Sequence, residues 1–72
     1  MVERAVPASW VGYKLDDMES PGKIRIAALS RAGKPMVPKP GLVGQESDVL
    51  YVSLAVEAMD ELEDRLVKGP RR

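Results

Sequence analysis

The sequence predicts an α+β fold: a small mixed, mainly antiparallel sheet with a short helix and an amphipathic C-terminal helix packed on it. Three observations predict this class. Residues 48–54 alternate in the pattern of a β-strand, and from Val56 onward the apolar residues change to helical spacing. A second alternating run, residues 23–31, ends at Ala32-Gly33, a pair suited to a chain reversal. Strands and helices that follow one another in this order predict helices packed on one small sheet.

Length and composition bound the size of the core. The 72 residues form one predicted domain, residues 1–72, without Phe, Cys or His and with a single Trp. The core is therefore expected to be aliphatic, with no disulfide or zinc site to stabilise it. Chains of this size often gain stability by forming oligomers, so a homodimer with a largely aliphatic interface is predicted. The lack of Cys, of a long apolar run and of a signal-peptide pattern suggests a cytoplasmic protein without direct membrane insertion.

The N-terminal third is expected to contain a short strand and a short helix. Residues 2–6 alternate as a strand, which Pro7 ends or places at a sheet edge. Gly12 is a predicted loop position. Helical spacing of Val11, Leu15 and Met18 then predicts about two helical turns, ending before the turn pair at 21–22.

The middle of the chain predicts a β-hairpin. Strict alternation along residues 23–31 would place Ile24, Ile26 and Ala28 on one face, and Arg25, Leu29 and Arg31 on the other. Gly33 accepts a positive φ in the turn. The return strand, residues 35–37, contains a proline and is therefore predicted at an edge.

The last third predicts a central strand that leads into the terminal helix. The strand is apolar on both faces, so we expect it to be covered on each side. In the helix, Val56, Met59, Leu62 and Leu66 fall on one stripe. Gly69 and Pro70 then predict the end of the helix. Asp48, just before the strand, is predicted to be structural, because its carboxylate can accept hydrogen bonds from nearby backbone amides.

Charge is distributed unevenly along a chain whose formal net charge is zero. Residues 20–45 contain five basic and no acidic residues, whereas residues 46–66 contain seven acidic residues against one arginine. The predicted ligand-binding residues are four of the basic ones: Arg25, Arg31, Lys34 and Lys39. On one strand face Arg25 and Arg31 would lie roughly 20 Å apart, which suits two phosphates or a ligand shared across a dimer groove. The alternative is that these side chains are merely solvated.

Other function classes find little support in the residue types. The chain has no His, no Cys, no phosphate-binding glycine loop and no nucleophile elbow, so we predict that it is not an enzyme and needs no metal or other cofactor. The acidic residues of the last helix are interpreted as a solvated face rather than a cation site. Nucleic-acid binding is not expected, because no aromatic residue accompanies the basic block. Trp10 is either an interface anchor or a cap on the core.

The order of these motifs resembles the C-terminal regulatory (TrkA-C, or RCK C-terminal) domain of potassium-uptake and potassium-channel regulators. The resemblance covers residues 3–66. Its motifs are Val6-Pro7, Gly12, IRIAALSRAG at 24–33, Val37-Pro38, the strand at 48–50 and AVEAMDEL at 55–62. Two positions depart from the family pattern: Ser47 stands where glycine is usual, and Trp10 where a smaller residue is common.

The resemblance implies a non-catalytic, ligand-sensing and dimerising module of a potassium transport system. In some members of the family cyclic di-AMP lies between two copies, so cyclic di-AMP is the expected ligand. A membrane subunit of a potassium channel or transporter is the expected partner of the full-length protein. The family's nucleotide-binding domain would lie upstream and is absent from these residues. Expected interface residues are Trp10, Val11 and Leu29, and expected structural residues are Gly12, Gly33 and Asp48. The alternative is a structural dimerisation module that binds no small molecule.

Overall fold

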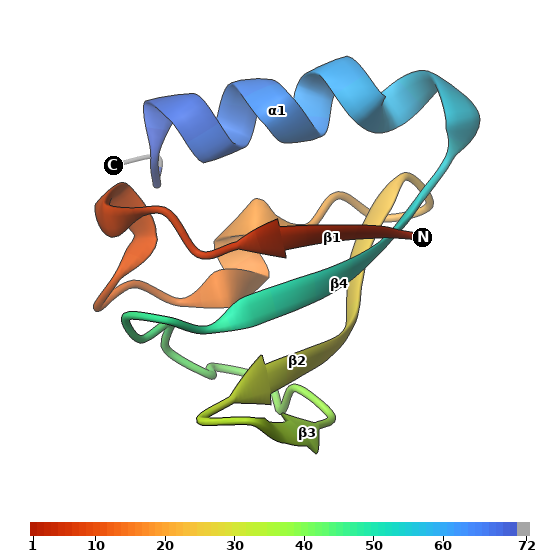
Figure 1. Cartoon of the computed structure of the whole chain (residues 1–72). Helices are drawn as coiled ribbons and strands as arrows, with labels where there is room; N and C mark the ends of the chain where they lie inside the picture. Colours follow the sequence, from red (N-terminus) through yellow and green to blue (C-terminus); the bar gives the residue numbers. More distant parts are fainter. Residues whose placement is uncertain (71–72) are drawn as a thin grey trace.

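The computed structural model describes residues 1–70 and contains one four-stranded sheet. Its strands are β1 (Val2–Ala5), β2 (Ile24–Arg31), β3 (Lys34–Met36) and β4 (Val49–Leu54). They are arranged in the order β1-β4-β2-β3, and every neighbouring pair is antiparallel (Figure 1). The predicted α+β class is confirmed, with a sheet that is wholly antiparallel rather than mixed. The strand that contains Pro35, β3, is an edge strand, as predicted, and β1, which ends two residues before Pro7, is the other edge.

The terminal helix is shorter than its sequence pattern predicts. It consists of a 3₁₀ turn, η3 (Val56–Ala58), followed by α1 (Met59–Lys68), and ends at Gly69, whose φ is +80°. Val56 is 97% exposed, so the predicted stripe is wrong at its first position. The residues that α1 and η3 bury are Ala58, Leu62 and Leu66, because Ala58 lies one turn before Leu62. Figure 1 shows α1 along one side of the sheet, with the β2–β3 hairpin at the far end.

The predicted N-terminal helix is wrong as a single element. Two separate 3₁₀ turns, η1 (Ala8–Trp10) and η2 (Leu15–Met18), take its place. Gly12, with φ +87°, separates them, and its backbone N–H donates to the carbonyl of Gly44 instead of continuing a helix. Leu15 and Met18 are nevertheless buried, as the spacing predicts, whereas Val11 is exposed. The apolar pattern was correct at two positions out of three because 3₁₀ turns bury residues at almost the same spacing.

A bulge in β2 overturns the predicted faces of this strand. The register with β4 shifts between Ile26 and Ala28. The extra residue returns Leu29 to the face of Ile24 and Ile26, and leaves Ala28 on the opposite face beside Tyr51. A strand without a bulge would have done the reverse. The core face therefore carries Ile24, Ile26 and Leu29, and Arg25 lies on the outer face.

The core lies between the inner face of the sheet and the helical turns. The buried residues are Val6, Trp10, Leu15, Met18, Ile24, Ile26, Leu29, Leu50, Val52, Ala58, Leu62 and Leu66. On β4 the inner-face residues Leu50 and Val52 are fully buried, but Val49 and Tyr51 are half-buried and Ser53 is exposed. The prediction that this strand is covered on both sides is therefore wrong for the outer face, which no other element of the described chain covers. None of the described helices has the length and apolar character needed to span a membrane.

Candidate functional site

The structure separates the four predicted ligand-binding residues into different surroundings. Arg25 is exposed on the outer face of β2, whereas Arg31 ends the same strand on the inner side, because the bulge lies between them. Lys34 is exposed beside the hairpin turn, and Lys39 lies in the loop that follows β3. The expectation that Arg25 and Arg31 share one strand face is therefore wrong.

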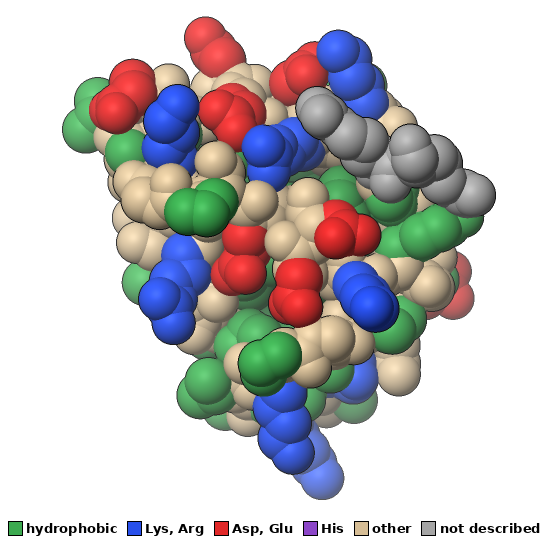
Figure 2. Space-filling model, turned by 180° about the vertical axis from the view of Figure 1, so that it is seen from behind, with side chains coloured by type: hydrophobic (Ala, Val, Ile, Leu, Met, Phe, Trp, Pro, Cys, Tyr) green, Lys and Arg blue, Asp and Glu red, His purple; other side chains and the backbone are tan. Residues whose placement is uncertain are grey.

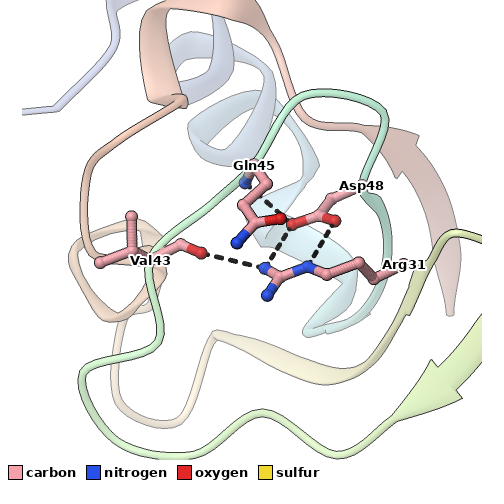
Figure 3. Close-up of polar contacts among 4 residues, drawn as sticks. All are labelled: Arg31, Val43, Gln45 and Asp48. Atoms are coloured by element: carbon pink, nitrogen blue, oxygen red, sulfur yellow. Dashed lines mark hydrogen bonds and ion pairs between the residues drawn. The ribbon is translucent and has the colours of Figure 1, made fainter.

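Arg31 is held by a fully buried carboxylate (Figure 3). Its Nε and one terminal nitrogen donate to the two carboxylate oxygens of Asp48 at 2.9 and 2.7 Å. The same terminal nitrogen donates to the carbonyl of Val43 at 3.0 Å, and the backbone N–H of Gln45 donates to Asp48 at 2.9 Å. These bonds fasten residues 43–48 to the end of the hairpin.

Electrostatics agree with this bidentate geometry. Asp48 is 0% exposed, and the hydrogen bonds from Arg31 hold its pKa below the ordinary value despite the opposing effect of burial. The backbone N–H of Gln45 lowers the pKa of Asp48 further. The bond to Asp48 in turn raises the pKa of Arg31. Both groups are thus charged at neutral pH, and two of the donors of Arg31 are committed within the chain.

Arg25 and Lys39 line one open hollow on the surface, which we call the basic hollow. It has a volume of about 560 Å³ and lies between the turn that precedes β2 and the loop that follows β3. Its lining comprises Asp16, Glu19, Ser20, Pro21, Gly22, Ile24, Arg25, Ile26, Pro38, Lys39 and Pro40. Neither Arg25 nor Lys39 has an ion-pair partner among residues 1–70. The hollow therefore combines two available cations with proline and isoleucine side chains.

The two carboxylates of the basic hollow are used as structural ties. Asp16 accepts a hydrogen bond from the backbone N–H of Gly41 at 2.7 Å, which fixes the loop after β3. Glu19 accepts one from the N–H of Ile26 at 2.9 Å, on the side of β2 that the short strand β3 does not reach. Sequence reasoning missed both contacts. The positive φ of Gly41 and the shortness of β3 are only weak indications of these two contacts.

The expected interface residues also have different positions. Trp10 is 1% exposed and its indole N–H donates to the carbonyl of Arg65 at 2.9 Å, so it anchors the core and is not on a surface. Leu29 is 0% exposed because the β2 bulge turns it inward. Val11 and Val43 are both exposed. They belong to two neighbouring segments, which are joined by backbone hydrogen bonds between residues 12–15 and 42–44.

Fold and site together define a small α+β domain with an open surface hollow that is lined by two available cations and two hydrogen-bonded carboxylates. Within residues 1–70, no three carboxylates lie close enough to hold a metal ion. Figure 2 shows acidic and basic side chains interspersed near α1, and only Lys or Arg side chains projecting at the opposite, lower end.

Sequence comparison adds a relative of known name. Over 70 residues the chain is 29% identical to the Trk system potassium uptake protein TrkA of Streptomyces coelicolor. The match covers 97% of this chain but 31% of that protein, so the chain spans about a third of the relative's length. No protein-family model matches the chain. The comparison confirms the resemblance that the order of motifs suggested.

Proposed function

We propose that this chain is a non-catalytic regulatory domain of a potassium-uptake system and binds a small anionic ligand in the basic hollow. The observation that carries the proposal is the similarity to TrkA, which extends over nearly the whole chain. The full-length protein would act on a potassium channel or transporter subunit in the membrane from the cytoplasmic side. The domain itself would bind no nucleic acid.

The chemistry of the basic hollow supports a phosphorylated ligand. Arg25 offers a planar fork of donors and Lys39 a compact point charge, and both suit phosphate oxygens. Prolines 38 and 40 supply apolar surface on which a base can pack. A nucleotide such as cyclic di-AMP combines these two properties. Because Arg31 is held by Asp48, the proposed contacts are made by Arg25 and Lys39 and not by Arg31 or Lys34.

Calorimetric titration tests the proposed site. Cyclic di-AMP, and ATP in a parallel experiment, should release heat with the parent chain, and Arg25→Ala or Lys39→Ala should weaken binding by about tenfold or more, the usual worth of a charged hydrogen bond. Lys34→Ala is the matched control, since Lys34 is an exposed cation outside the hollow. The proposed site is wrong if neither nucleotide binds at near-millimolar concentration, or if the Lys34 variant loses as much affinity as the other two.

A second candidate function is structural dimerisation without a ligand, and the exposed pair Val11 and Val43 favours it. We propose a homodimer whose interface includes these two valines, because burying their exposed apolar surface against a second copy is favourable. Analytical ultracentrifugation at micromolar concentration should show a dimer, which Val43→Glu should dissociate. Val67→Glu, at an exposed valine on α1, is the control and should leave the dimer intact. A purely monomeric parent chain would rule out this interface.

A further inference from the structure

Arg65, near the end of α1, connects three segments of the chain. One of its terminal nitrogens donates to the backbone carbonyls of Met18 and Glu19 at 3.0 and 2.8 Å. The other is held by Glu61, one turn earlier on the same helix, at 2.7 Å. Its own carbonyl accepts the indole N–H of Trp10. The guanidinium is therefore fixed on its helix and fastened to the end of η2.

Glu19 continues this connection into the basic hollow. Its backbone carbonyl is held by Arg65, while its carboxylate accepts the N–H of Ile26. Ile26 is the residue at which the register of β2 shifts. Glu19 also lines a second hollow of about 720 Å³ beneath the C-terminal end of α1, together with Asp64, Arg65 and Lys68. It therefore separates two open spaces. Its carbonyl and carboxylate are held as described, and its backbone N–H donates to the carbonyl of Asp16 at 3.0 Å.

We propose that Glu19 and Arg65 are positioning residues that couple the basic hollow to helix α1. Arg65 sets the position of the Glu19 backbone, and Glu19 in turn closes the free edge of β2 at Ile26, where the hollow begins. A ligand beside Arg25 that moves the Glu19 carboxylate then alters the support of α1. The coupling rests on the proposed function, because it links the proposed ligand site to α1. Its test uses no ligand, so its result does not depend on whether a nucleotide binds.

The chain offers a matched control for Arg65. Arg4 on β1 also fastens α1, through hydrogen bonds from its guanidinium to the carboxylate of Glu63, one of them at 3.1 Å. It contacts neither hollow. Arg4→Met and Arg65→Met each remove one arginine tie to α1, but only the second removes support from Glu19.

Amide hydrogen exchange followed by NMR tests the coupling. The Val52 amide of β4 serves as the reporter of global opening. Relative to it, the Ile26 amide should exchange about tenfold faster or more in Arg65→Met. This is the change expected when a charged hydrogen bond that supports the site is lost. Arg4→Met should change both amides equally. Glu19→Ala should remove the protection of Ile26, and Glu19→Gln should restore it, because the amide oxygen of Gln can accept the same bond. If Arg65→Met does not fold, Arg65→Lys keeps the charge but has a single nitrogen, which cannot replace the two that bind Glu61 and the two carbonyls, and the same comparison applies.

Two outcomes would overturn the coupling. One is that Ile26 and Val52 exchange faster by the same factor in both Arg65 variants, which would make Arg65 a purely global stabiliser. The other is that Arg4→Met exposes the Ile26 amide as selectively as Arg65→Met does. The coupling would be established if the Arg65 variants speed exchange of the Ile26 amide selectively and Glu19→Gln keeps the protection that Glu19→Ala loses.

Discussion

Removal of the Asp48 carboxylate tests the centre of the polar network. Asp48 accepts three hydrogen bonds and is fully buried, so Asp48→Ala leaves two donors of Arg31 and the N–H of Gln45 without their acceptor. Breaking a fully buried pair in this way costs about 3–5 kcal/mol. The Arg31 side chain is 24% exposed and Gln45 is exposed, so water can reach both donors. We therefore expect Asp48→Ala to lower the free energy of unfolding by about 2–3 kcal/mol, less than a fully buried pair would lose.

The effect of Asp48 should also depend on pH in a defined direction. Arg31 lowers the pKa of Asp48 in the folded state below its ordinary 3.8. A carboxyl whose folded pKa is depressed stabilises the fold above its unfolded pKa and loses that contribution as the pH falls through the folded value. The difference in stability between the parent and Asp48→Asn should therefore be constant from about pH 5 to 8 and shrink below about pH 4.

Urea denaturation followed by fluorescence of the single, buried Trp10 measures both effects. Asp48→Asn is the matched variant, since it keeps the shape of the side chain and removes the charge. A loss below about 0.5 kcal/mol for Asp48→Ala, which is the range of ordinary surface substitutions, would refute the structural assignment. A loss for Asp48→Asn that is undiminished at low pH would refute the electrostatic reasoning.

Three further substitutions follow from backbone geometry and from the indole. Ser47 has φ +73°, so Ser47→Gly should raise stability by about 0.5–1 kcal/mol in urea denaturation, since relief of the strain exceeds the entropy that glycine adds to the unfolded chain. Ala32 has φ +54° in the two-residue turn between Arg31 and Lys34, so Ala32→Asn should stabilise by a similar amount, about 0.5–1 kcal/mol; an unchanged urea midpoint would count against it. Trp10→Phe should cost about 1–2 kcal/mol by circular dichroism, because the bond to the carbonyl of Arg65 and part of the buried volume are lost; a neutral result would mean that this bond does not contribute.

The strands were predictable because their signal is local. Alternation in residues 49–54 and the turn at 32–33 predicted β4 and the hairpin, and the proline in the return strand predicted that β3 is an edge. The bulge in β2 was not predictable, since Ala27 and Ala28 are both small and apolar and either fits either face. One unseen extra residue was enough to exchange the positions of Leu29 and Ala28.

The candidate site was predictable only in composition. The basic block identified Arg25 and Lys39, which the fold brings to one hollow. It could not show that Arg31 is held by Asp48, because the two are 17 residues apart and neither residue type predicts the pairing. The Ser47 departure did carry a signal: glycine is usual there in the family that the chain resembles, and the position has a positive φ.

Hydrogen bonds from charged side chains compensate for the small size of the core. In a chain of this length without disulfides, loops such as residues 38–47 bury little apolar surface and must be fixed by other means. Asp16, Asp48 and Arg31 fix this segment by bonds to its backbone, at Gly41, Gln45 and Val43. Bonds from a charged group to the backbone combine charge assistance with a fixed geometry, whereas the surface pair of Lys68 with Asp64 on α1 gains little in water. Arg25 and Lys39, the two cations that line the basic hollow, take no part in such bonds, so their charge is available to a ligand without loss of these contacts.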